Sequence, residues 1–297
     1  MSTAASRPWS EIERRAGFKR LKGERDLAGL GPTLARSGSL EARLAETKRD
    51  IRRAQELRYR VFFEEGTAVP DKTSSLIRRD VCRFDAVCDH LLVVDHAARS
   101  RRDESKVVGV YRLLRQEIAE RHFGFYSAGE FEVAALTGRR PDLRFLEVGR
   151  ACVATSHRGR HVLDLLWRGL WTYARHHQAD VLIGCASLAG ADPAAHLATV
   201  RALAAGGDEG LRANPRPDRA VALDGFVAPS LDRRALARVL PPLVKGYWRL
   251  GATFSPDLVA DPAFGSTDMF VALPLDGVER RFLEHFGVAE DRAALAA

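Results

Sequence analysis

The sequence has few cysteines, and it lacks long apolar runs and a recognisable targeting segment. Across its 297 residues, no apolar run approaches the ~18 residues that a membrane-spanning helix requires. The first 26 residues have no apolar core, which disfavours a secretory signal, and several acidic residues, which disfavour a transit peptide. The four cysteines show no CxxC spacing. We therefore expect a cytoplasmic protein with free thiols.

Several motifs for cofactors and catalysis are also missing. There is no GxxxxGK[ST] loop and no GxGxxG after a strand, which disfavours a nucleotide site of either type. There is no HExxH motif and no His/Cys cluster at zinc spacing, although nine histidines are present. A GxSxG nucleophile elbow is absent as well. The sequence therefore predicts neither a resident cofactor nor a metal.

Positive charge is concentrated near the N-terminus. The formal net charge is +7, and the first 60 residues hold 15 Lys and Arg against 8 Asp and Glu, which accounts for the whole surplus. A basic segment of this kind suits an acidic partner, such as nucleic acid, an anionic membrane surface or an acidic carrier protein. The alternative is a solvated helical face without a partner.

The hydrophobic pattern predicts a polar, basic extension over residues 1–38 and one α/β domain over residues 39–297 with a mixed sheet flanked by helices. The strand at 89–95 and the strand at 107–114 read as an antiparallel hairpin with a long charged loop. The other expected elements are a strand in "SLEARLAE", a helix in "KRDIRRAQELRYRVFFEEG", a strand at 144–154, a helix after the turn at 156–160, a strand at 179–187, a helix opened by Asp192-Pro193, an exposed excursion at 206–217, and one helix with one or two strands near the C-terminus.

Charged residues lie inside several of these apolar elements. Glu147 and Arg150 interrupt one strand, and Arg112 interrupts another. Buried charges are costly unless they are paired, so this pattern indicates either a polar site or an ion-pair network. Glu147 is the main candidate for function, because perturbed carboxylates gather at active sites. For the two arginines, pairing that shapes the site is the favoured role. Other charged residues of the same regions are Arg58, Arg60, Asp85 and Asp89.

Gly149 lies between Glu147 and Arg150. A glycine inside a strand often marks a bulge, and a bulge here would separate this strand from the next and open a cleft. The turn "SHRGR" at 156–160 would lie at the rim of that cleft. A basic, glycine-containing turn that opens a helix can hold a phosphate on backbone N–H groups. The alternative is two solvated arginines at a helix start. The candidate phosphate-binding residues at this turn are Arg158, Gly159, Arg160 and His161.

The strand, cleft, basic turn and helix resemble the acyl-donor site of the GNAT superfamily of N-acyltransferases, which implies a GNAT-like sheet with a splayed central strand pair. The superfamily pattern is Arg or Gln, two residues, Gly, one residue, then Gly or Ala. Arg158 matches its first position, whereas His161 and Leu163 replace its two small residues. This departure weakens the expectation that the chain binds the pyrophosphate of coenzyme A.

A narrower resemblance covers about residues 39–287. The chain is similar to bacterial L-ornithine N-acyltransferases, the first enzymes of ornithine-lipid synthesis, which are sometimes labelled hemolysin-like. The matching segments are collinear. They are "SLEARLAE", "AQELRYRVFFEE", "CDHLLVVD", "VVGVYRLL", "GFYSAGEFE", "LEVGRACV", "LLWRGLWTYARHH", "GCASLAGADP", "LPPLVKGYWRLGA" and "FGSTDMFVAL".

This resemblance implies transfer of a 3-hydroxyacyl chain from acyl carrier protein to the α-amine of L-ornithine, giving a lyso-ornithine lipid. The phosphopantetheine of the carrier would then be a co-substrate held at the basic turn. The implied partners are acidic carrier protein and ornithine rather than nucleic acid, and a peripheral contact with the inner membrane face stays open.

Within this interpretation, Glu147 is the candidate general base, directly or through water. A backbone N–H near Ala151, Cys152 or Val153 would polarise the thioester oxygen. The carboxylate of the acceptor needs a cation, and three arginines remain equivalent candidates for that role. They are Arg60, Arg112 and Arg150.

Three alternatives to this function remain, one of which is a non-catalytic module that binds carrier protein and that turnover would exclude. More distantly, a charged and aromatic set resembles the core of acyl-homoserine-lactone synthases, which also use carrier protein, so such a synthase is the alternative enzyme. A membrane-damaging hemolysin is disfavoured by the lack of any membrane span. The residues of the set are Arg60, Phe63, Asp85, Asp89, Arg112, Glu147 and Arg150.

Overall fold

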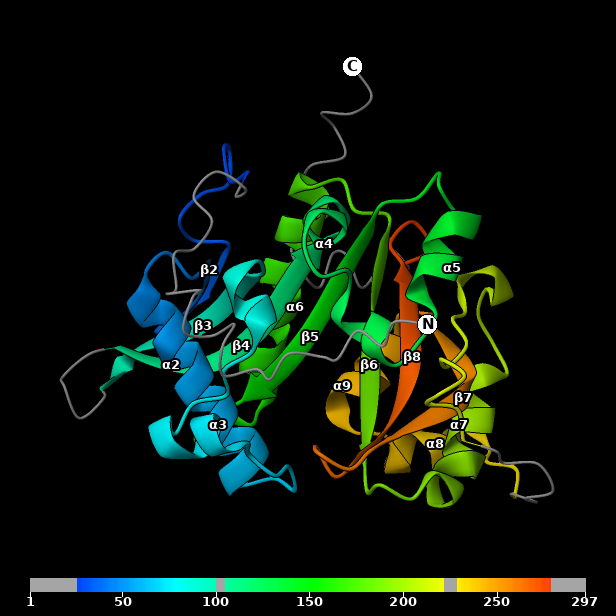
Figure 1. The fold of residues 1–297 in the computed structure, drawn as a ribbon. Helices are drawn as coiled ribbons and strands as arrows, with labels where there is room; N and C mark the ends of the chain where they lie inside the picture. Colours follow the sequence, from blue (N-terminus) through cyan, green and yellow to red (C-terminus); the bar gives the residue numbers. More distant parts are fainter. Residues whose placement is uncertain (1–25, 100–104, 222–228, 279–297) are drawn as a thin grey trace, which may run out of the picture.

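The computed structural model describes residues 26–99, 105–221 and 229–278 (Figure 1). The strands are β1 (Ala35–Ser37), β2 (Leu40–Leu44), β3 (Asp89–Arg99), β4 (Ser105–Arg115), β5 (Phe145–Val153), β6 (Val181–Ala189), β7 (Thr253–Asp261) and β8 (Ser266–Pro274). The α-helices are α2 (Lys48–Tyr59), α3 (Lys72–Ile77), α4 (Gln116–Arg121), α5 (Val133–Arg139), α6 (Arg160–His176), α7 (Leu197–Ala204), α8 (Arg233–Val239) and α9 (Pro242–Arg249). The shorter turns are the π-helical η1 (Arg60–Glu64) and the 3₁₀ segments η2 (Arg83–Ala86), η3 (Tyr126–Gly129), η4 (Thr155–His157), η5 (Pro193–His196) and η6 (Glu209–Leu211).

The eight described strands form one sheet in the order β1-β2-β3-β4-β5-β6-β8-β7. Neighbouring strands are antiparallel except for β5 and β6, which are parallel and are connected through α6. The expected mixed α/β sheet is therefore confirmed. Strand β1 pairs with β2, so the sheet begins before the expected domain boundary at residue 39. That boundary stays a prediction, because residues 1–25 lie outside the described ranges.

Helices cover both faces of the sheet. Figure 1 shows α2 in front of β3 and β4, and α6 behind them. A capping box starts α2, in which Thr47 and Asp50 each accept a hydrogen bond from the other's backbone N–H. The apolar side of α2 buries Leu57 against the front face, whereas α6 buries Leu166 against the back face, beside Gly109 of β4. Both packings follow from apolar residues at helical spacing.

One sequence-based expectation about loops is wrong, and another needs refinement. The hairpin strands β3 and β4 continue into the region expected to be a long charged loop, because their ladder extends to the pair Arg99 and Ser105. Most residues at 206–217 are exposed, as expected, but two apolar side chains anchor the stretch. Leu211 and Ala213 are each 2% exposed and pack against the front-face core, and Ala213 donates its backbone N–H to Ser255 Oγ at 3.2 Å.

The parallel pair β5 and β6 separates after three residue pairs, the last being Glu147 with Ile183. Next to this point, the register of β4 against β5 shifts between Arg112 and Val110. The bulge predicted beside Gly149 is thus present, but the residue with left-handed backbone is Arg150, with φ of 53°. Gly149 itself is not among the described residues with positive φ, so the bulge does not depend on a left-handed glycine.

Candidate active site

A cavity of about 310 Å³ occupies the space where β5 and β6 separate. Because side chains alternate along strands, its lining divides between the two faces of the sheet. The front face contributes polar groups. These are Arg112, Tyr126, Glu147, Arg150, Cys185, Ser187, Asp261 and Asp268. The back face, towards α9, contributes mainly apolar groups. These are Tyr111, Val148, Ala186, Leu243, Val244, Tyr247 and Val271.

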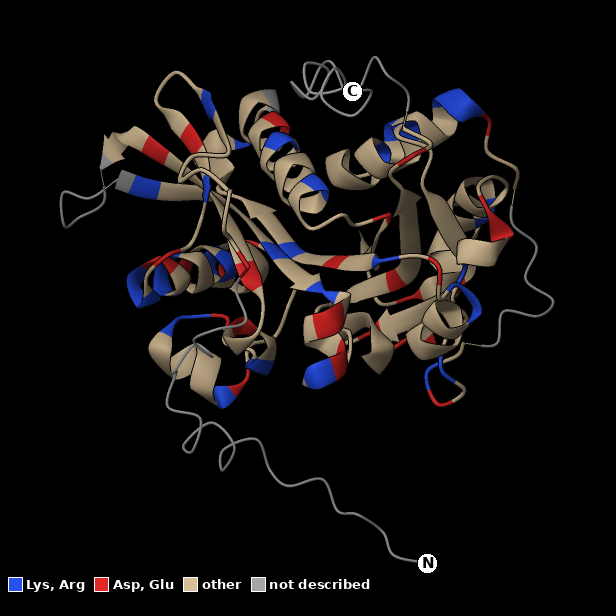
Figure 2. Cartoon of the chain, turned by 90° about the horizontal axis from the view of Figure 1, so that it is seen from above, with Lys and Arg blue, Asp and Glu red and all other residues tan. Residues whose placement is uncertain are grey.

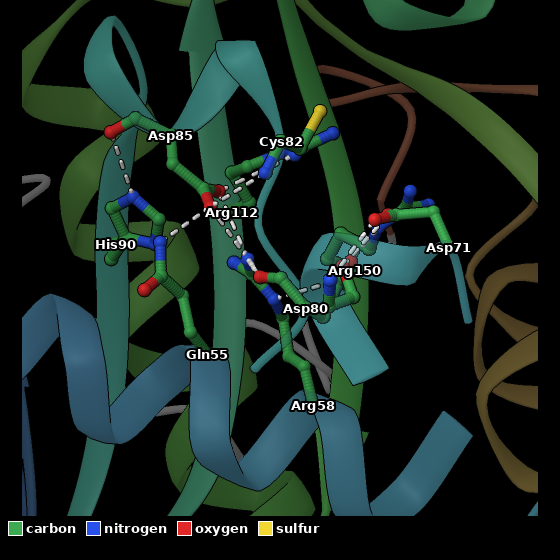
Figure 3. A network of polar contacts seen from close by, with 10 residues as sticks. Gln55, Arg58, Asp71, Asp80, Cys82, Asp85, His90, Arg112 and Arg150 are labelled. Carbon is green, nitrogen blue, oxygen red and sulfur yellow. Dashed lines mark hydrogen bonds and ion pairs between the residues drawn. The ribbon is translucent and has the colours of Figure 1, made fainter. Parts of the chain in front are cut away.

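A buried ion-pair network lies between α2 and the polar wall of the cavity (Figure 3). Arg58 of α2 is fully buried, and it pairs with Asp80 and Asp85, with N–O distances of 2.8 Å in both pairs. Burial alone would raise the pKa of Asp85, but the charges of Arg58, His90 and Arg112 hold that pKa well below its usual range. Asp85 therefore favours its ionised form, in which it contacts both Arg58 and Arg112.

Arg112 and Arg150 form the basic part of the cavity wall. Arg112 Nη1 lies 3.5 Å from Asp85 Oδ1, and Arg150 Nε lies 3.3 Å from Asp80 Oδ2. Both guanidinium groups stack against the ring of Tyr126, at 5.0 and 4.8 Å from its centroid. The Arg112 side chain is only 3% exposed, and within the described residues its Nη1 has no hydrogen-bond partner. A buried guanidinium nitrogen facing a cavity is suited to an anionic ligand group.

Glu147 lies at the point where the strands separate, and its side chain is buried. Its carboxylate accepts hydrogen bonds from Tyr126 N at 2.6 Å, Ser127 N at 2.7 Å and Ser127 Oγ at 2.5 Å. Burial raises the pKa of Glu147, and these hydrogen bonds partly oppose that rise. A carboxylate has roughly four lone-pair sites, so one acceptor position is left for a substrate or water. Its role as general base stays a prediction.

Two other predicted site residues do not line the cavity. Arg60 is exposed at the start of η1, on the turn that follows α2. Asp89 is buried on β3, where it accepts a hydrogen bond from Tyr173 Oη at 2.8 Å. Of the three arginines considered for the acceptor carboxylate, only Arg112 and Arg150 reach the cavity.

The basic turn forms η4 and leads directly into α6. Gly159 is the N-cap residue of α6, and no side chain caps the helix there. Arg158 is about half exposed, and its Nη2 lies 3.2 Å from Glu65 Oε2. His161 is exposed in the first turn, whereas the side chain of Arg160 lies outside the described residues. Among the described residues, no capping side chain thus competes with a phosphate for the first N–H groups of α6, whereas Arg158 already has an acidic partner.

The strand that follows the bulge carries the residues expected to polarise a thioester. Ala151 lines the cavity directly. Cys152 pairs with Val110 of β4, and two residues later Ala154 donates its backbone N–H to Val108 O at 2.8 Å. Because alternate residues of a strand direct their backbone N–H groups to the same neighbour, that of Cys152 faces β4 and that of Val153 faces the cleft. This geometry leaves the backbone of Val153, rather than that of Cys152, directed towards an incoming thioester.

Sequence-based reasoning missed the acidic part of the cavity. Asp261 and Asp268 come from the closing hairpin of β7 and β8, and Glu130 lies just after η3. Cys185 Sγ donates a hydrogen bond to Glu130 Oε2 at 3.4 Å, which joins the cluster to β6. No local motif marks these carboxylates, but Asp268 lies on β8 directly before an apolar run, which was an available signal.

Charged residues are found on the central strands of the sheet and not only on its surface helices. Figure 2 shows Lys, Arg, Asp and Glu on central strands as well as on the outer helices. None of the helices in the described ranges combines the length and the apolar character that a membrane crossing requires.

Comparison with known proteins gives consistent relatives. Residues 57–168 match a family model described as an acetyltransferase (GNAT) domain. The chain is 44% identical to the L-ornithine N(alpha)-acyltransferase of Brucella abortus (strain 2308), over 87% of this chain and 92% of that protein. It is 42% identical to the protein of the same name from Agrobacterium fabrum (strain C58 / ATCC 33970), over 86% and 88% of the two chains.

Among solved structures, FeeM, an N-acyl amino acid synthase from uncultured soil microbes, aligns with 81% of this chain and 94% of its own. The TM-score is 0.46 and the sequence identity is 11%. The open sheet with a separated β5–β6 pair, together with the matched GNAT domain, confirms the expected GNAT-like fold.

Proposed function

The chain belongs to the L-ornithine N(alpha)-acyltransferase family, and from this premise we propose that it acylates the α-amine of L-ornithine with a 3-hydroxyacyl chain from acyl carrier protein. The product would be a lyso-ornithine lipid. The observation that carries this proposal is the cavity between β5 and β6, which has a charged wall on one face of the sheet and an apolar wall on the other. An amino acid suits the first wall and an acyl chain suits the second.

The chemistry requires a neutral amine, a polarised thioester and a proton acceptor. The α-amine attacks the thioester carbon, the new C–N bond forms as the C–S bond breaks, and the carrier leaves as a thiol. Glu147 accepts the amine proton directly or through one water, using the lone-pair position that Tyr126 and Ser127 leave open. The backbone N–H near Val153 would stabilise the developing oxyanion.

The donor is proposed to be a carrier protein because the start of α6 is built for one phosphate. Phosphopantetheine presents a single phosphate to the open N–H groups that follow Gly159. His161 and Leu163 occupy the positions where the superfamily has small residues, which hinders a close backbone approach to a diphosphate. Arg158 would exchange Glu65 for the phosphate or for an acidic carrier surface. Contact with an anionic membrane surface belongs to the same proposal.

The test is an assay with purified protein, L-ornithine and the same acyl group on carrier protein or on coenzyme A. We expect an N-acylornithine product by mass spectrometry, formed mainly from the carrier-bound donor. Glu147→Gln should lower kcat by about 10²-fold or more with little change in KM for the donor. Ser127→Ala is the matched control, because it removes one hydrogen bond to Glu147 and keeps the base. Near-normal kcat in Glu147→Gln would end the assignment of Glu147.

A further inference from the structure

Three buried carboxylates gather on the front face of the sheet, next to the cavity. Glu130, Asp261 and Asp268 are 6%, 9% and 5% exposed. Ligand atoms of Glu130, Cys185 and Asp268 all lie within 4.8 Å of one another, and Asp261 and Asp268 line the cavity itself. Within the described part of the chain, none of the three carboxylates forms an ion pair with Lys or Arg.

This lack of an ion pair among the described residues has an electrostatic consequence. Burial, followed by the charge of Asp268, raises the pKa of Glu130 to about 7. Burial also raises the pKa of Asp268, although Ser187 and Ser266 donate hydrogen bonds to it. Carboxylates that are desolvated next to one another are costly to ionise, and a cation placed between them would relieve that cost.

The opposite part of the same wall has the complementary feature. Arg112 is buried and lines the cavity, and its Nη1, 3.5 Å from Asp85 Oδ1, has no hydrogen-bond partner among the described residues. Arg150, beside it, lies close enough to Asp268 for its charge to lower the pKa of that carboxyl. One cavity is therefore lined by arginines on one part of its wall and by carboxylates on the other, and this combination points to a ligand that carries both charges.

We infer that the cavity selects amino acids with a second, side-chain ammonium group: Arg112 and Arg150 bind the α-carboxylate, and Asp261 and Asp268, backed by Glu130, bind the side-chain ammonium. This inference rests on the proposed function and names the residues that determine its acceptor. Binding at both ends would hold the α-amine between them, at the point where the strands separate and Glu147 lies.

Selectivity between acceptors follows because an acceptor without a side-chain ammonium leaves the carboxylates of the cavity unpaired. An amino acid with an apolar side chain would bury against Asp261 and Asp268 without compensating either charge. A site built to bind a polar substrate group rejects the analogue that lacks it far more strongly than an apolar pocket rejects a missing methylene. We therefore expect wild-type protein to prefer L-ornithine to L-norvaline, which has the same carbon chain without the side-chain amine, by at least about 10²-fold in kcat/KM.

The experiment compares both acceptors in Asp268→Asn. We expect kcat/KM for ornithine to fall by about 10²-fold, mainly through KM, while kcat/KM for norvaline stays the same or rises. Asp257→Asn is the matched control, because Asp257 is exposed on β7, and it should match wild type with both acceptors. If thermal unfolding shows that Asp268→Asn is unfolded, Glu130→Gln takes its place. This variant should also lower the preference for ornithine over norvaline.

Three outcomes would overturn the inference. Equal losses for ornithine and norvaline in the variants would assign the carboxylates a structural role. Equal use of both acceptors by wild type would refute the selectivity and leave the acyltransferase function standing. If EDTA abolished the preference for ornithine and Zn²⁺ restored it, the cluster of Glu130, Cys185 and Asp268 would be a metal site instead. If wild type acylates neither acceptor, the proposed function itself fails.

Discussion

Nη2 of Arg58 lies 2.8 Å from Oδ2 of Asp85, and both side chains are completely buried. Arg58 is held from the other side by Asp80, and Asp85 also receives a hydrogen bond from Gln55 Nε2 at 2.9 Å. The same Asp85 lies 3.5 Å from Arg112, so this pair connects α2 to the basic wall of the cavity (Figure 3). A helix that packs on the sheet thus also positions the groups that face the substrate.

We expect Arg58→Ala to lower the free energy of unfolding by about 3–5 kcal/mol, because it leaves two buried carboxylates without their cation. Urea unfolding monitored by circular dichroism measures this loss. Arg78→Ala is the control, since Arg78 pairs with Glu64 at the surface and should cost about 0–1 kcal/mol. Similar losses of unfolding free energy in the two variants would show that the buried ion pair contributes no more to stability than the surface pair.

The raised pKa of Glu130 makes a prediction about pH. Glu130 ionises near its ordinary 4.5 in the unfolded chain and near 7 in the folded protein. The folded state therefore holds one extra proton between these values, and wild type loses stability as pH rises from about 4.5 to 7. The groups that face Glu130 are Asp268, Asp261, Cys185 and Arg219.

Relative to wild type, Glu130→Gln should gain stability across this window, by up to about 3 kcal/mol, and the difference should level off above pH 7. Urea unfolding at pH 5, 6, 7 and 8 gives the difference directly, with Asp257→Asn as a control that should show no such trend. A gain for Glu130→Gln that does not vary with pH would mean that Glu130 titrates normally.

The sequence predicts the regular elements because their signals are local. Leu40, Ala42 and Leu44 alternate along β2, and the apolar stripe of α6 has helical spacing. Short helices escaped prediction because two turns carry too few residues for a periodic pattern. Helix α3, for example, has six residues and depends on Asp71, which accepts hydrogen bonds from Thr73 N and Ser74 N.

The sequence predicts the basic part of the candidate site but not its acidic part, again because only local signals can be read from a sequence. Glu147, Arg112 and Arg150 stand out because each interrupts an apolar strand, and all three reach the cavity. Glu130 lies in a loop, and its proximity to Asp268 depends on contacts between residues far apart in sequence. Only the folded sheet brings such carboxylates together, so no sequence window contains the acidic wall.

Gly149 tests the origin of the cleft. A Cβ added at Gly149 would meet nothing within 4 Å, and the strained backbone belongs to Arg150. We therefore expect Gly149→Ala to change the free energy of unfolding by no more than about 0.5 kcal/mol. Gly149→Val should also fold, but its side chain would narrow the cavity and raise KM for ornithine.

Thermal unfolding and steady-state kinetics on both variants separate these effects. Arg150→Gly is the informative comparison, since it relieves the left-handed backbone and removes a cation from the wall. It should fold at least as well as Gly149→Ala and bind ornithine much more weakly. Unfolding of Gly149→Ala would restore the view that the bulge depends on this glycine.

The last prediction concerns the donor and follows from the start of α6. Carrier proteins are acidic, the first 60 residues of this chain hold its whole positive surplus, and Arg158 is exposed beside the uncapped helix. Opposite charges speed association, and salt screens them over ~10 Å at 0.1 M. We expect added salt to raise KM for acyl carrier protein and to leave kcat largely unchanged.

Arg158→Ala should raise KM for the carrier several-fold at low salt and flatten its dependence on salt, because one attractive charge is lost next to the start of α6. Arg140→Ala is the matched control, since Arg140 pairs with Asp142 at the end of α5 and should leave both quantities unchanged. Initial rates at several salt concentrations, with carrier-bound and coenzyme-bound acyl groups, measure the effect. Salt-independent carrier kinetics, or equal kcat/KM for both donors, would refute carrier recognition at this turn.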